Sequence, residues 1–347
     1  MTRILITGCC GVLGENLVQH LFQKGEYDIV GFDLYPAKDT LLHQMTFIQG
    51  DITKFQEVKA AMHEIDIVIH AASASPAYHE KKITNIVVTG TRILLEQAEL
   101  QKIDRFIYIS STAVYGIPER MPMRETDPIQ PYHDPYNRAK AAAEKVCLEY
   151  REQGLCLPIL RPRTFLGPNR LGTFAMLFEW AQEGRHFPIL GKGHNRYQFL
   201  DVVDLCEAIY LAMKGKQKLV NDTFNIGAQE FGSMKESYQA VLTDAGFGKK
   251  IRCIPAAPAM LLLDFLSKLK LTPLYKRLYR KVHLDYYVST EKAERVLGFV
   301  AQYSNTQTLV RSYRWYCEHQ TVIEATPGTR NNAKWNQGIL RYAKFFF

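Results

Sequence analysis

The stretch "ILITGCCGVLGENL", residues 4–17, decides which fold is expected of this chain. It places Gly8, Gly11 and Gly14 between a β-branched apolar run and a segment whose apolar residues recur with helical spacing. In such a strand–turn–helix, the first glycine allows a tight turn and the second lets the backbone approach a pyrophosphate. The third lets the helix pack on the strand. The free N–H groups that begin the helix then bind the phosphates. The stretch therefore predicts a dinucleotide site.

Asp33 indicates which of the two nicotinamide dinucleotides binds. It ends a second apolar run, "DIVGFD" (28–33), about 20 residues further on, where a carboxylate binds the adenosine ribose hydroxyls. The same carboxylate would repel the 2′-phosphate of NADP. The predicted cofactor is therefore NAD.

The bulk composition is that of an ordinary globular protein, with 47% hydrophobic and 22% charged residues in 347. No segment approaches the ~18 uninterrupted apolar residues of a spanning helix, and the N-terminus enters a strand without room for a signal peptide. Seven cysteines without metal-type spacing predict reduced thiols, a cytoplasmic location and no metal site. Cys9 and Cys10 are expected to fill the loop, with a redox switch at the helix N-terminus as the alternative.

The net charge of +8 raises the question of a nucleic-acid partner. The chain contains no recognised nucleic-acid-binding motif, and its best-defined site already binds a phosphate-rich cofactor. We therefore expect no nucleic-acid partner.

Strand-like and helical segments alternate through the first half of the chain, which predicts an α/β fold with a doubly wound parallel sheet. We expect this domain to span 1–160, with returning segments near 195–230 that include a strand at "DTFNIG" (222–227). Proline and glycine interrupt the pattern beyond Arg161. Residues 161–194 and 231–325 are expected to form a smaller substrate-binding lobe, and 326–347 a C-terminal tail.

Three polar residues carry the predicted chemistry. Tyr136 and Lys140 in "DPYNRAKAAAEK" lie one helical turn apart, so the lysine ammonium would favour the phenolate and make the tyrosine a usable base. Ser111 in "YISSTAVYG" follows a predicted strand, at the sheet edge where such folds gather their catalytic groups. Its hydroxyl can bind the substrate oxygen as that oxygen becomes a carbonyl.

Together these residues resemble the extended short-chain dehydrogenase/reductase family, in its NAD-dependent epimerase/dehydratase branch. The resemblance extends to about Phe299 and implies a Rossmann fold. Besides the glycine loop and the catalytic residues, the matching pieces are "GDI" (50–52), "HAAS" (70–73), "GTRILLE" (90–96), "RPRTFLGP" (161–168), "FLDVVDLCEAI" (199–209), "FNIG" (224–227) and "STEKAERVLGF" (289–299).

The resemblance also implies which residues contact the ligands. The expected NAD contacts are Gly8, Cys10, Gly11, Val12, Leu13, Gly14, Asp33, Asp51, Ile52, Ala71, Ala72, Ser73, Tyr136 and Lys140, with Asp51 on the adenine. The expected substrate contacts are Ser111, Thr112, Thr164 and Arg196.

Two departures from the family pattern narrow the reaction. Family dehydratases carry an Asp-Glu pair directly after the catalytic serine or threonine, and this chain has Thr112 and Ala113 there. The decarboxylating relatives keep a glutamate where Ala113 stands. Without either carboxylate, neither an acid to expel a hydroxyl nor a base to remove a neighbouring proton is evident. We therefore expect redox chemistry at one carbinol, as an epimerase or as a net dehydrogenase or ketoreductase.

The residues expected to bind the substrate also depart from the family pattern. Thr164 stands where sugar-nucleotide epimerases usually have a diphosphate-binding asparagine, and Val87 replaces another family asparagine. Tyr197 takes the place of a later diphosphate arginine, and Arg196 is shifted by one. The remaining candidates for a diphosphate are Arg161, Arg163, Arg170 and Arg196.

The segment 260–285 raises a second possibility for the substrate. An apolar run, "MLLLDFL" (260–266), leads into a stretch with six cations, and such a basic amphipathic segment can lie on an anionic membrane. Hydroxysteroid dehydrogenases of the same broad family have a comparable apolar segment at this position. We expect instead that these leucines are buried in the substrate lobe, the commoner fate of such a run.

The leading prediction is an NAD-dependent oxidoreductase or epimerase acting on a nucleoside-diphosphate sugar. The alternative is an enzyme similar to 3β-hydroxysteroid dehydrogenases that acts on a hydroxylated lipid, peripheral to the inner face of a membrane. A third alternative is a non-catalytic NAD-binding protein. A homodimer is expected from surplus apolar residues on the helices near Asn85 and Tyr136, which family members pair with their copies: Val87, Val88, Ile93, Leu94, Ala141, Ala142, Val146 and Leu148.

Overall fold

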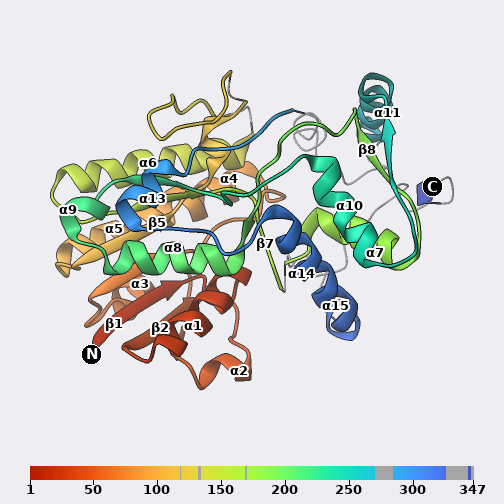
Figure 1. Ribbon diagram of the computed structural model, residues 1–347. Helices are drawn as coiled ribbons and strands as arrows, with labels where there is room; N and C mark the ends of the chain where they lie inside the picture. Colours follow the sequence, from red (N-terminus) through yellow and green to blue (C-terminus); the bar gives the residue numbers. More distant parts are fainter. Residues whose placement is uncertain (118, 132–133, 169, 270–283, 326–342, 345–347) are drawn as a thin grey trace. The chain divides into compact units, whose positions relative to one another are not determined.

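A seven-stranded sheet organises the first half of the chain (Figure 1). The computed structural model describes residues 1–117, 119–131, 134–168, 170–269, 284–325 and 343–344. The strand order is β10-β6-β5-β4-β1-β2-β3, and each neighbouring pair is parallel. The strands are β1 (Thr2–Thr7), β2 (Tyr27–Asp33), β3 (Thr46–Gln49), β4 (Ile67–His70), β5 (Arg105–Ile109), β6 (Ile159–Pro162) and β10 (Thr223–Ile226).

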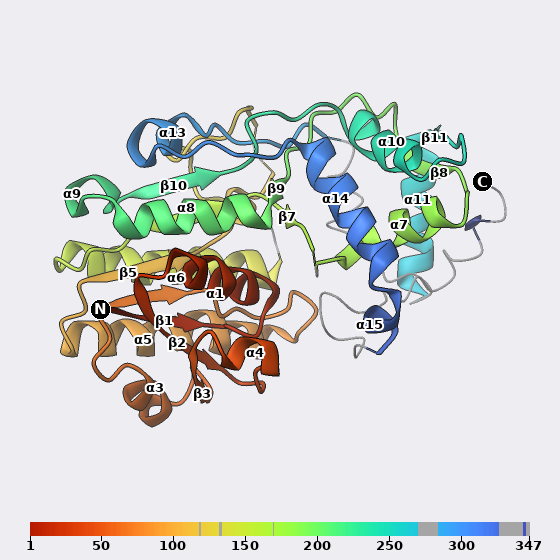
Figure 2. The same cartoon turned by 60° about the horizontal axis from the view of Figure 1, so that its bottom comes forward.

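Helices cover both faces of this sheet because its β-branched residues are apolar on both sides. The helices α3 (Phe55–Ala61), α5 (Gly90–Leu100) and α6 (Pro135–Glu152) share one hydrophobic core with the strands. The helices α1 (Val12–Lys24) and α8 (Val202–Lys214) pack against each other, side by side in both ribbon views (Figure 2). The predicted doubly wound parallel α/β fold is confirmed.

One helix differs from the expected pattern. The sequence predicts a helix over 85–100, whereas the structure starts it earlier, at α4 (Glu80–Thr84), and passes through a π-helical segment, Asn85–Thr89, into α5. At the junction, a Cβ on Gly90 would lie 2.8 Å from Ile52 Cδ1. The absent side chain thus lets the helix backbone approach the segment after β3.

The chain divides into two compact units. Unit 1 contains residues 1–163, 202–226 and 288–300, and unit 2 contains 164–201, 227–287 and 301–347. The third segment of unit 1 holds α13 (Glu291–Leu297) and begins at a β-bridge between Met123 and Val288. The sequence interpretation had assigned this segment to the lobe, because a short helix carries no sign of which sheet it returns to.

Unit 2 has a hydrophobic core of its own around Trp180, which is 1% exposed. Its helices are α7 (Ala175–Gln182), α10 (Met234–Asp244), α11 (Ala256–Lys268), α14 (Asn305–Glu318) and α15 (Gln320–Ala325). Its paired strands are β8 (Phe187–Leu190) with β11 (Ile251–Ile254), and β7 (Phe165–Leu166) with β9 (Leu200–Asp201). Ser233 and Ser304 begin α10 and α14 with reciprocal capping boxes.

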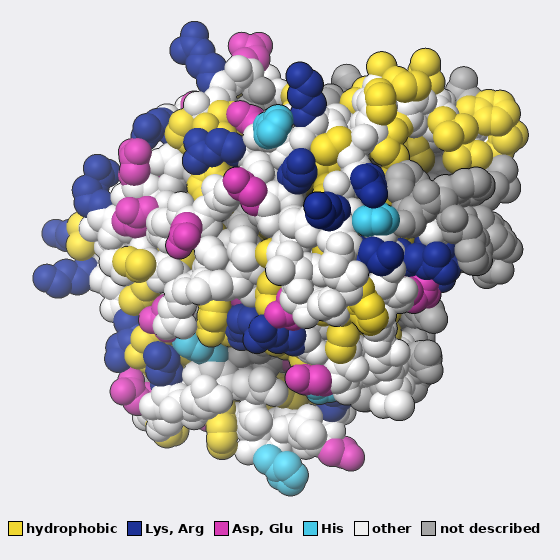
Figure 3. Space-filling view, turned by 45° about the vertical axis from the view of Figure 1, so that its right-hand side comes forward, with side chains coloured by type: hydrophobic (Ala, Val, Ile, Leu, Met, Phe, Trp, Pro, Cys, Tyr) yellow, Lys and Arg dark blue, Asp and Glu magenta, His cyan; other side chains and the backbone are white. Residues whose placement is uncertain are grey.

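The leucines of α11 are not buried, so that expectation was wrong. Leu261, Leu262 and Phe265 are 71%, 57% and 59% exposed. Figure 3 shows hydrophobic side chains gathered at its upper right. The basic part of this segment (270–283) and most of the tail lie outside the described residues. Among the helices that the structure describes, none is both long enough and apolar enough to span a bilayer.

Candidate active site

The glycine loop between β1 and α1 requires that its backbone approach neighbouring backbone segments closely. Gly8 has φ +74° and donates its N–H to Phe32 O at 2.8 Å. A Cβ on Gly8 would lie 2.7 Å from the Cα of Ala72, and one on Gly14 would lie 2.2 Å from Gly8 O. Larger residues at these two positions would therefore force β1, α1 and the loop after β4 apart.

The N-terminus of α1 remains open. Gly11 is the N-cap residue with extended backbone, and no side chain caps the first turn. A Cβ on Gly11 would meet only Gly8 O, at 3.2 Å, and the residue is exposed. Unpaired N–H groups above a glycine with free space are what a pyrophosphate requires, so the residues present fit a dinucleotide.

The carboxylate of Asp33 is held in place at the end of β2. Its Oδ2 accepts the N–H of Cys10 at 3.0 Å, and its Oδ1 accepts the N–H of Tyr35 at 3.0 Å. The side chain is half-buried. These two bonds join the end of β2 to the glycine loop and fix the position of the carboxylate.

The other predicted cofactor residues follow neighbouring strands. Asp51 comes after β3 and accepts the N–H of Thr53 at 2.8 Å, and Ile52 is buried. Ala71, Ala72 and Ser73 follow β4, with Ser73 exposed. Because the carboxyl ends of parallel strands share one edge, the structure brings these residues to the edge that holds Gly8 and Asp33. Of the predicted contacts in the glycine loop and at the start of α1, Cys10 and Val12 are half-buried, whereas Leu13 belongs to the core.

A buried histidine, missed by the sequence interpretation, connects these loops. His70 Nδ1 lies 2.7 Å from Thr7 Oγ1, and His70 Nε2 lies 3.0 Å from Thr91 Oγ1. Thr91 donates its only hydroxyl proton to Val87 O at 2.6 Å, so it must accept from Nε2–H. Thr7 then donates to Nδ1 and accepts the N–H of Ala72 at 3.3 Å.

This chain of bonds assigns His70 the neutral Nε2–H tautomer. Burial, and then the charge of Lys140, lower its pKa to about 3. Thr7 immediately precedes Gly8, so the histidine ties the glycine loop to the loop after β4. The sequence showed His70 only as the first letter of "HAAS", which does not reveal its partners.

Lys140 is buried at the end of β5. The residue is 2% exposed, and its Nζ donates to Ile109 O at 2.8 Å. The same Nζ lies 4.9 Å from the ring centroid of Tyr108. Burial lowers the pKa of Lys140, and Tyr136 acts in the opposite direction. Tyr136 is half-buried, one turn earlier on α6.

Side-chain caps begin both segments that carry the catalytic candidates, α6 and the short turn after β5. Asp134 accepts the N–H of Asn137 at 3.2 Å and so begins α6 just before Tyr136. Ser111 is half-buried, and its Oγ accepts the N–H of Ala113 at 3.2 Å. This bond uses one lone pair of the serine and leaves its O–H free to donate. The structure thus places Ser111 and Lys140 at the same end of β5.

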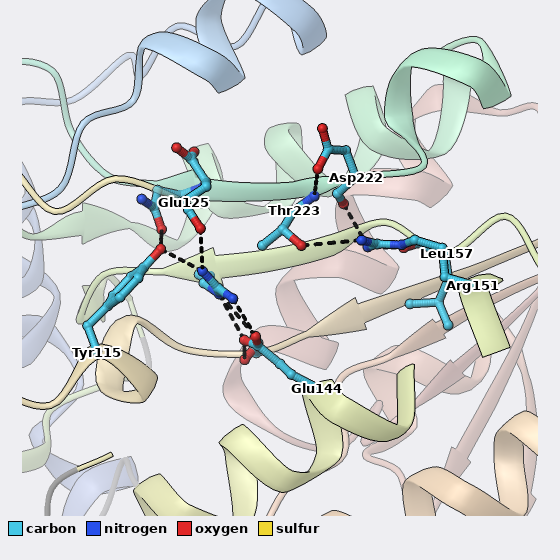
Figure 4. Close-up of polar contacts among 10 residues, drawn as sticks. Tyr115, Glu125, Glu144, Arg151, Leu157, Asp222 and Thr223 are labelled. Atoms are coloured by element: carbon cyan, nitrogen blue, oxygen red, sulfur yellow. Dashed lines mark hydrogen bonds and ion pairs between the residues drawn. The ribbon is translucent and has the colours of Figure 1, made fainter. Parts of the chain in front are cut away.

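The helix α6 also carries one half of a buried ion pair, whose Glu144 is labelled in Figure 4. Arg161 on β6 binds Glu144 on α6, with Nη2 2.6 Å from Oε2 and Nε 3.0 Å from Oε1. Arg161 Nη1 also donates to Tyr115 at 2.7 Å, and Ser110 donates to Glu144. Glu144 is 0% exposed and Arg161 4%. The pair joins α6 to β6, and the bond from Ser110 joins it to the end of β5, next to Ser111.

This network corrects part of the diphosphate prediction. Arg161 is committed to Glu144, and Arg163, 2% exposed, donates to Thr112 at 3.2 Å. Neither guanidinium is available to a ligand, because both act as internal supports. The sequence could not show this, since an arginine for a ligand and one for a buried carboxylate look alike.

The remaining substrate candidates belong to unit 2. Arg196 is exposed, and its guanidinium carbon lies 4.8 Å and 4.6 Å from the ring centroids of Phe231 and Tyr287. Arg170 covers the ring of Phe165 at 3.7 Å. Thr164 is half-buried, and its carbonyl accepts the N–H of Leu200 at 3.1 Å.

Comparison with known proteins identifies the family. The model of the NAD dependent epimerase/dehydratase family matches residues 4–227, which contain every element of the site in unit 1. The chain belongs to this family. A relative, the uncharacterised protein y4nG of Sinorhizobium fredii, is 36% identical over 97% of this chain and 84% of its own length.

Two proteins with named activities are less similar to this chain. A dTDP-glucose 4,6-dehydratase of Streptomyces niveus is 27% identical over 93% of this chain and 95% of its own length. The crystal structure of the UDP-glucose 4-epimerase of Thermotoga maritima with UDP-glucose superposes with a TM-score of 0.75 at 23% identity, covering 92% of this chain and 100% of that one. At this identity the superposition shows the shared fold.

Proposed function

We propose that this protein of the NAD-dependent epimerase/dehydratase family is an NAD-dependent epimerase or related oxidoreductase acting at one carbinol carbon of a nucleoside-diphosphate sugar. The observation that carries the proposal is the burial of Lys140 against Ile109 O, 2.8 Å away, at the strand end that also holds Ser111. A fully buried amine at the open edge of such a sheet, one turn from a tyrosine, is a costly arrangement that a structural role does not require.

NAD is the cofactor that the residues fit. The N–H groups at the start of α1 would hold the pyrophosphate, and the positioned carboxylate of Asp33 would bind the adenosine ribose hydroxyls. Asp51, Ile52 and residues 71–73 would line the adenine and nicotinamide sides. Bound NAD supplies a hydride acceptor at its nicotinamide ring.

The chain's own residues handle the proton. Tyr136 takes it from the substrate hydroxyl, because the nearby Lys140 ammonium favours the phenolate. Lys140 also binds the nicotinamide ribose. Ser111 donates its hydroxyl to the substrate oxygen as carbonyl character develops.

Sugar nucleotides are the substrate class supported by the relatives whose names specify dTDP-glucose and UDP-glucose. Other relatives of similar identity are named 3β-hydroxysteroid dehydrogenases, which supports the alternative described below. Dehydration is disfavoured because Thr112 and Ala113 follow Ser111, so neither of these two positions supplies a carboxylate to act as acid or base. Arg196 is the remaining exposed candidate for the diphosphate among the residues that the structure describes. We therefore expect epimerisation or simple oxidation.

The exposed face of α11 favours a second candidate function. Leu261, Leu262 and Phe265 together present the kind of apolar surface that marks a partner or membrane contact. An enzyme that oxidises a hydroxylated lipid would use this helix to reach a bilayer, and the cations of residues 268–281 would favour an anionic one. In this alternative the protein is cytoplasmic and peripheral to the membrane's inner face.

Co-sedimentation with anionic and neutral vesicles separates the two functions. The lipid alternative requires binding that falls with salt and is lost in Leu261→Ser combined with Phe265→Ser. The matched control is Leu219→Ser combined with Phe247→Ser, two comparably exposed residues elsewhere on the surface. Absence of vesicle binding by the full chain supports the sugar nucleotide.

We also propose a homodimer built from α5 and α6. Val87, Leu94 and Val146 turn out to be core residues, whereas Leu148 and Leu100 are 36% and 70% exposed. A twofold copy would cover these exposed residues. Sedimentation at micromolar concentration should show a dimer that Leu148→Glu disrupts; a monomeric parent chain would refute this assembly.

The reaction itself is tested with a panel of UDP-, dTDP- and GDP-sugars. NMR of the products shows whether the sugar is inverted at one carbon, oxidised or dehydrated. Inversion or oxidation of one panel member, lost in Tyr136→Phe, supports the proposal. A dehydrated product would contradict it.

A further inference from the structure

The glycine loop carries a cluster that its dinucleotide role does not need. Cys9 and Cys10 are adjacent, their Sγ atoms lie 3.8 Å apart, and both are free thiols. The two Sγ atoms and a carboxylate oxygen of Asp33 all lie within 4.8 Å of one another. Two thiols and a carboxylate converging from β2 and the β1–α1 loop are a ligand set for a thiophilic cation.

The distances suit a tetrahedral ion. With Zn–S bonds of about 2.3 Å, two thiolates on a tetrahedral zinc lie about 3.8 Å apart. The observed separation of the two Sγ atoms is 3.8 Å. With a Zn–O bond of about 2.0 Å, the carboxylate oxygen belongs about 3.5 Å from each sulfur, and in this structure it lies within 4.8 Å of both.

Loop packing accounts for only one of the two thiols. Cys9 is 0% exposed and its Sγ faces Gly31, where a Cβ would lie 2.8 Å from the sulfur. Cys10 is half-buried, and its thiol donates to Tyr35 O at 3.3 Å. An ion can therefore approach from the side of Cys10 and Asp33 and reach Cys9 behind them.

We propose that Cys9, Cys10 and Asp33 bind a thiophilic divalent cation, such as Zn²⁺ or Cd²⁺, and that this cation and the dinucleotide exclude each other. Binding releases the two thiol protons to solvent, and water fills the fourth position. Exclusion follows because the cation takes the Asp33 carboxylate that the ribose hydroxyls would use. This part rests on the proposed function, whereas cation binding itself does not.

The cation site is tested first without cofactor. Cd²⁺ is titrated into the reduced full chain, and the ultraviolet cadmium–thiolate charge-transfer band and the released protons are measured. We expect one site per chain, two protons released, and affinity at least tenfold lower in Cys10→Ser and in Asp33→Asn. Cys253→Ser, which removes an exposed thiol of unit 2, is the matched control and should bind as the parent does. A band that forms in Cys10→Ser with the parent's affinity, or no band in the parent, overturns the site.

Exclusion is tested by measuring NAD affinity by calorimetry with and without Zn²⁺. We expect Zn²⁺ to weaken NAD binding at least tenfold in the parent and in Cys253→Ser, and to have little effect in Cys9→Ser combined with Cys10→Ser. By linkage, NAD must weaken Zn²⁺ binding by the same factor. Simultaneous binding of both overturns the exclusion. If the metal-free parent fails to bind NAD while the cadmium band persists, the proposed function fails and the cation site stands.

Discussion

The Nζ of Lys140 donates to the carbonyl oxygen of Ile109 at 2.8 Å, so a buried amine on α6 is bonded to the last residue of β5. Ser110 and Ser111 follow at once along the chain. The bond fixes α6 against the strand end and places Tyr136, one turn earlier, at the same edge of the sheet. Burial lowers the pKa of the Lys140 amine, whereas a negative charge on the neighbouring Tyr136 raises it.

Replacing Lys140 by methionine should separate activity from stability. We expect turnover to fall by about 10²–10⁴-fold, because the phenolate loses its cation, whereas stability stays within about 1 kcal/mol since a buried charge is replaced by an apolar chain. Lys145→Met, an exposed change on the same helix, is the control. Steady-state rates and urea unfolding provide the two measurements. Full activity in Lys140→Met would remove this residue from the mechanism.

Asp33 should set the cofactor preference. The parent is expected to bind NAD far more tightly than NADP, and Asp33→Ala should shrink that ratio at least tenfold, because the 2′-phosphate no longer meets a carboxylate. Asp28→Ala, at the other end of the same strand, should leave the ratio unchanged. Calorimetry with both cofactors measures it. Equal affinities in the parent would show that Asp33 does not face the ribose.

His70 should make the fold sensitive to acid. Its pKa is about 3 in the fold against an ordinary 6.5, so the unfolded chain binds more protons between these values. The histidine's contribution to stability is complete above about pH 6.5 and is lost as the pH falls towards 3, by up to about 1.4 kcal/mol per unit.

The variant His70→Gln keeps one donor and one acceptor but does not titrate. Urea unfolding from pH 7 to pH 4 should therefore show a shallower loss of stability in His70→Gln than in the parent. His63→Gln, an exposed histidine, should follow the parent. Identical slopes in all three proteins would mean that His70 is not held neutral.

The Glu144–Arg161 pair should be needed for stability. Glu144→Gln leaves the buried Arg161 charge uncompensated, which should lower the free energy of unfolding by about 3–5 kcal/mol. Glu149→Gln, an exposed change on α6, should cost little. Replacing both partners, as Glu144→Leu with Arg161→Met, should recover part of the loss. A double variant as unstable as the single one would contradict this account.

Most of unit 1 could be predicted from local patterns. Buried strands with β-branched residues, the glycine spacing and Asp33 each carry their signal within a few residues, so the sheet and the cofactor edge follow from the sequence. The return of residues 223–226 to the sheet beside β6 was also predictable, because an apolar run followed by a glycine is typical of a buried strand.

Long-range partners could not be predicted. His70 is bonded to Thr7 and Thr91, 63 and 21 residues away, and Arg161 to Glu144 on another element, so neither role has a local signature. The exposed face of α11 was missed for a similar reason. An apolar run predicts that a helix has an apolar face. Whether that face is buried depends on the elements that pack beside it, which the run does not show.

The central claim is that Tyr136 removes a proton while a carbinol of a sugar nucleotide is oxidised. The most direct measurement is a single turnover in which enzyme loaded with NAD is mixed with the active panel sugar and nicotinamide absorbance is followed. We predict transient or lasting reduction of the bound cofactor in the parent, slowed at least 10²-fold in Tyr136→Phe with cofactor binding nearly unchanged. Conversion of the sugar at the parent rate by Tyr136→Phe, or without any reduction of the cofactor, would contradict the account.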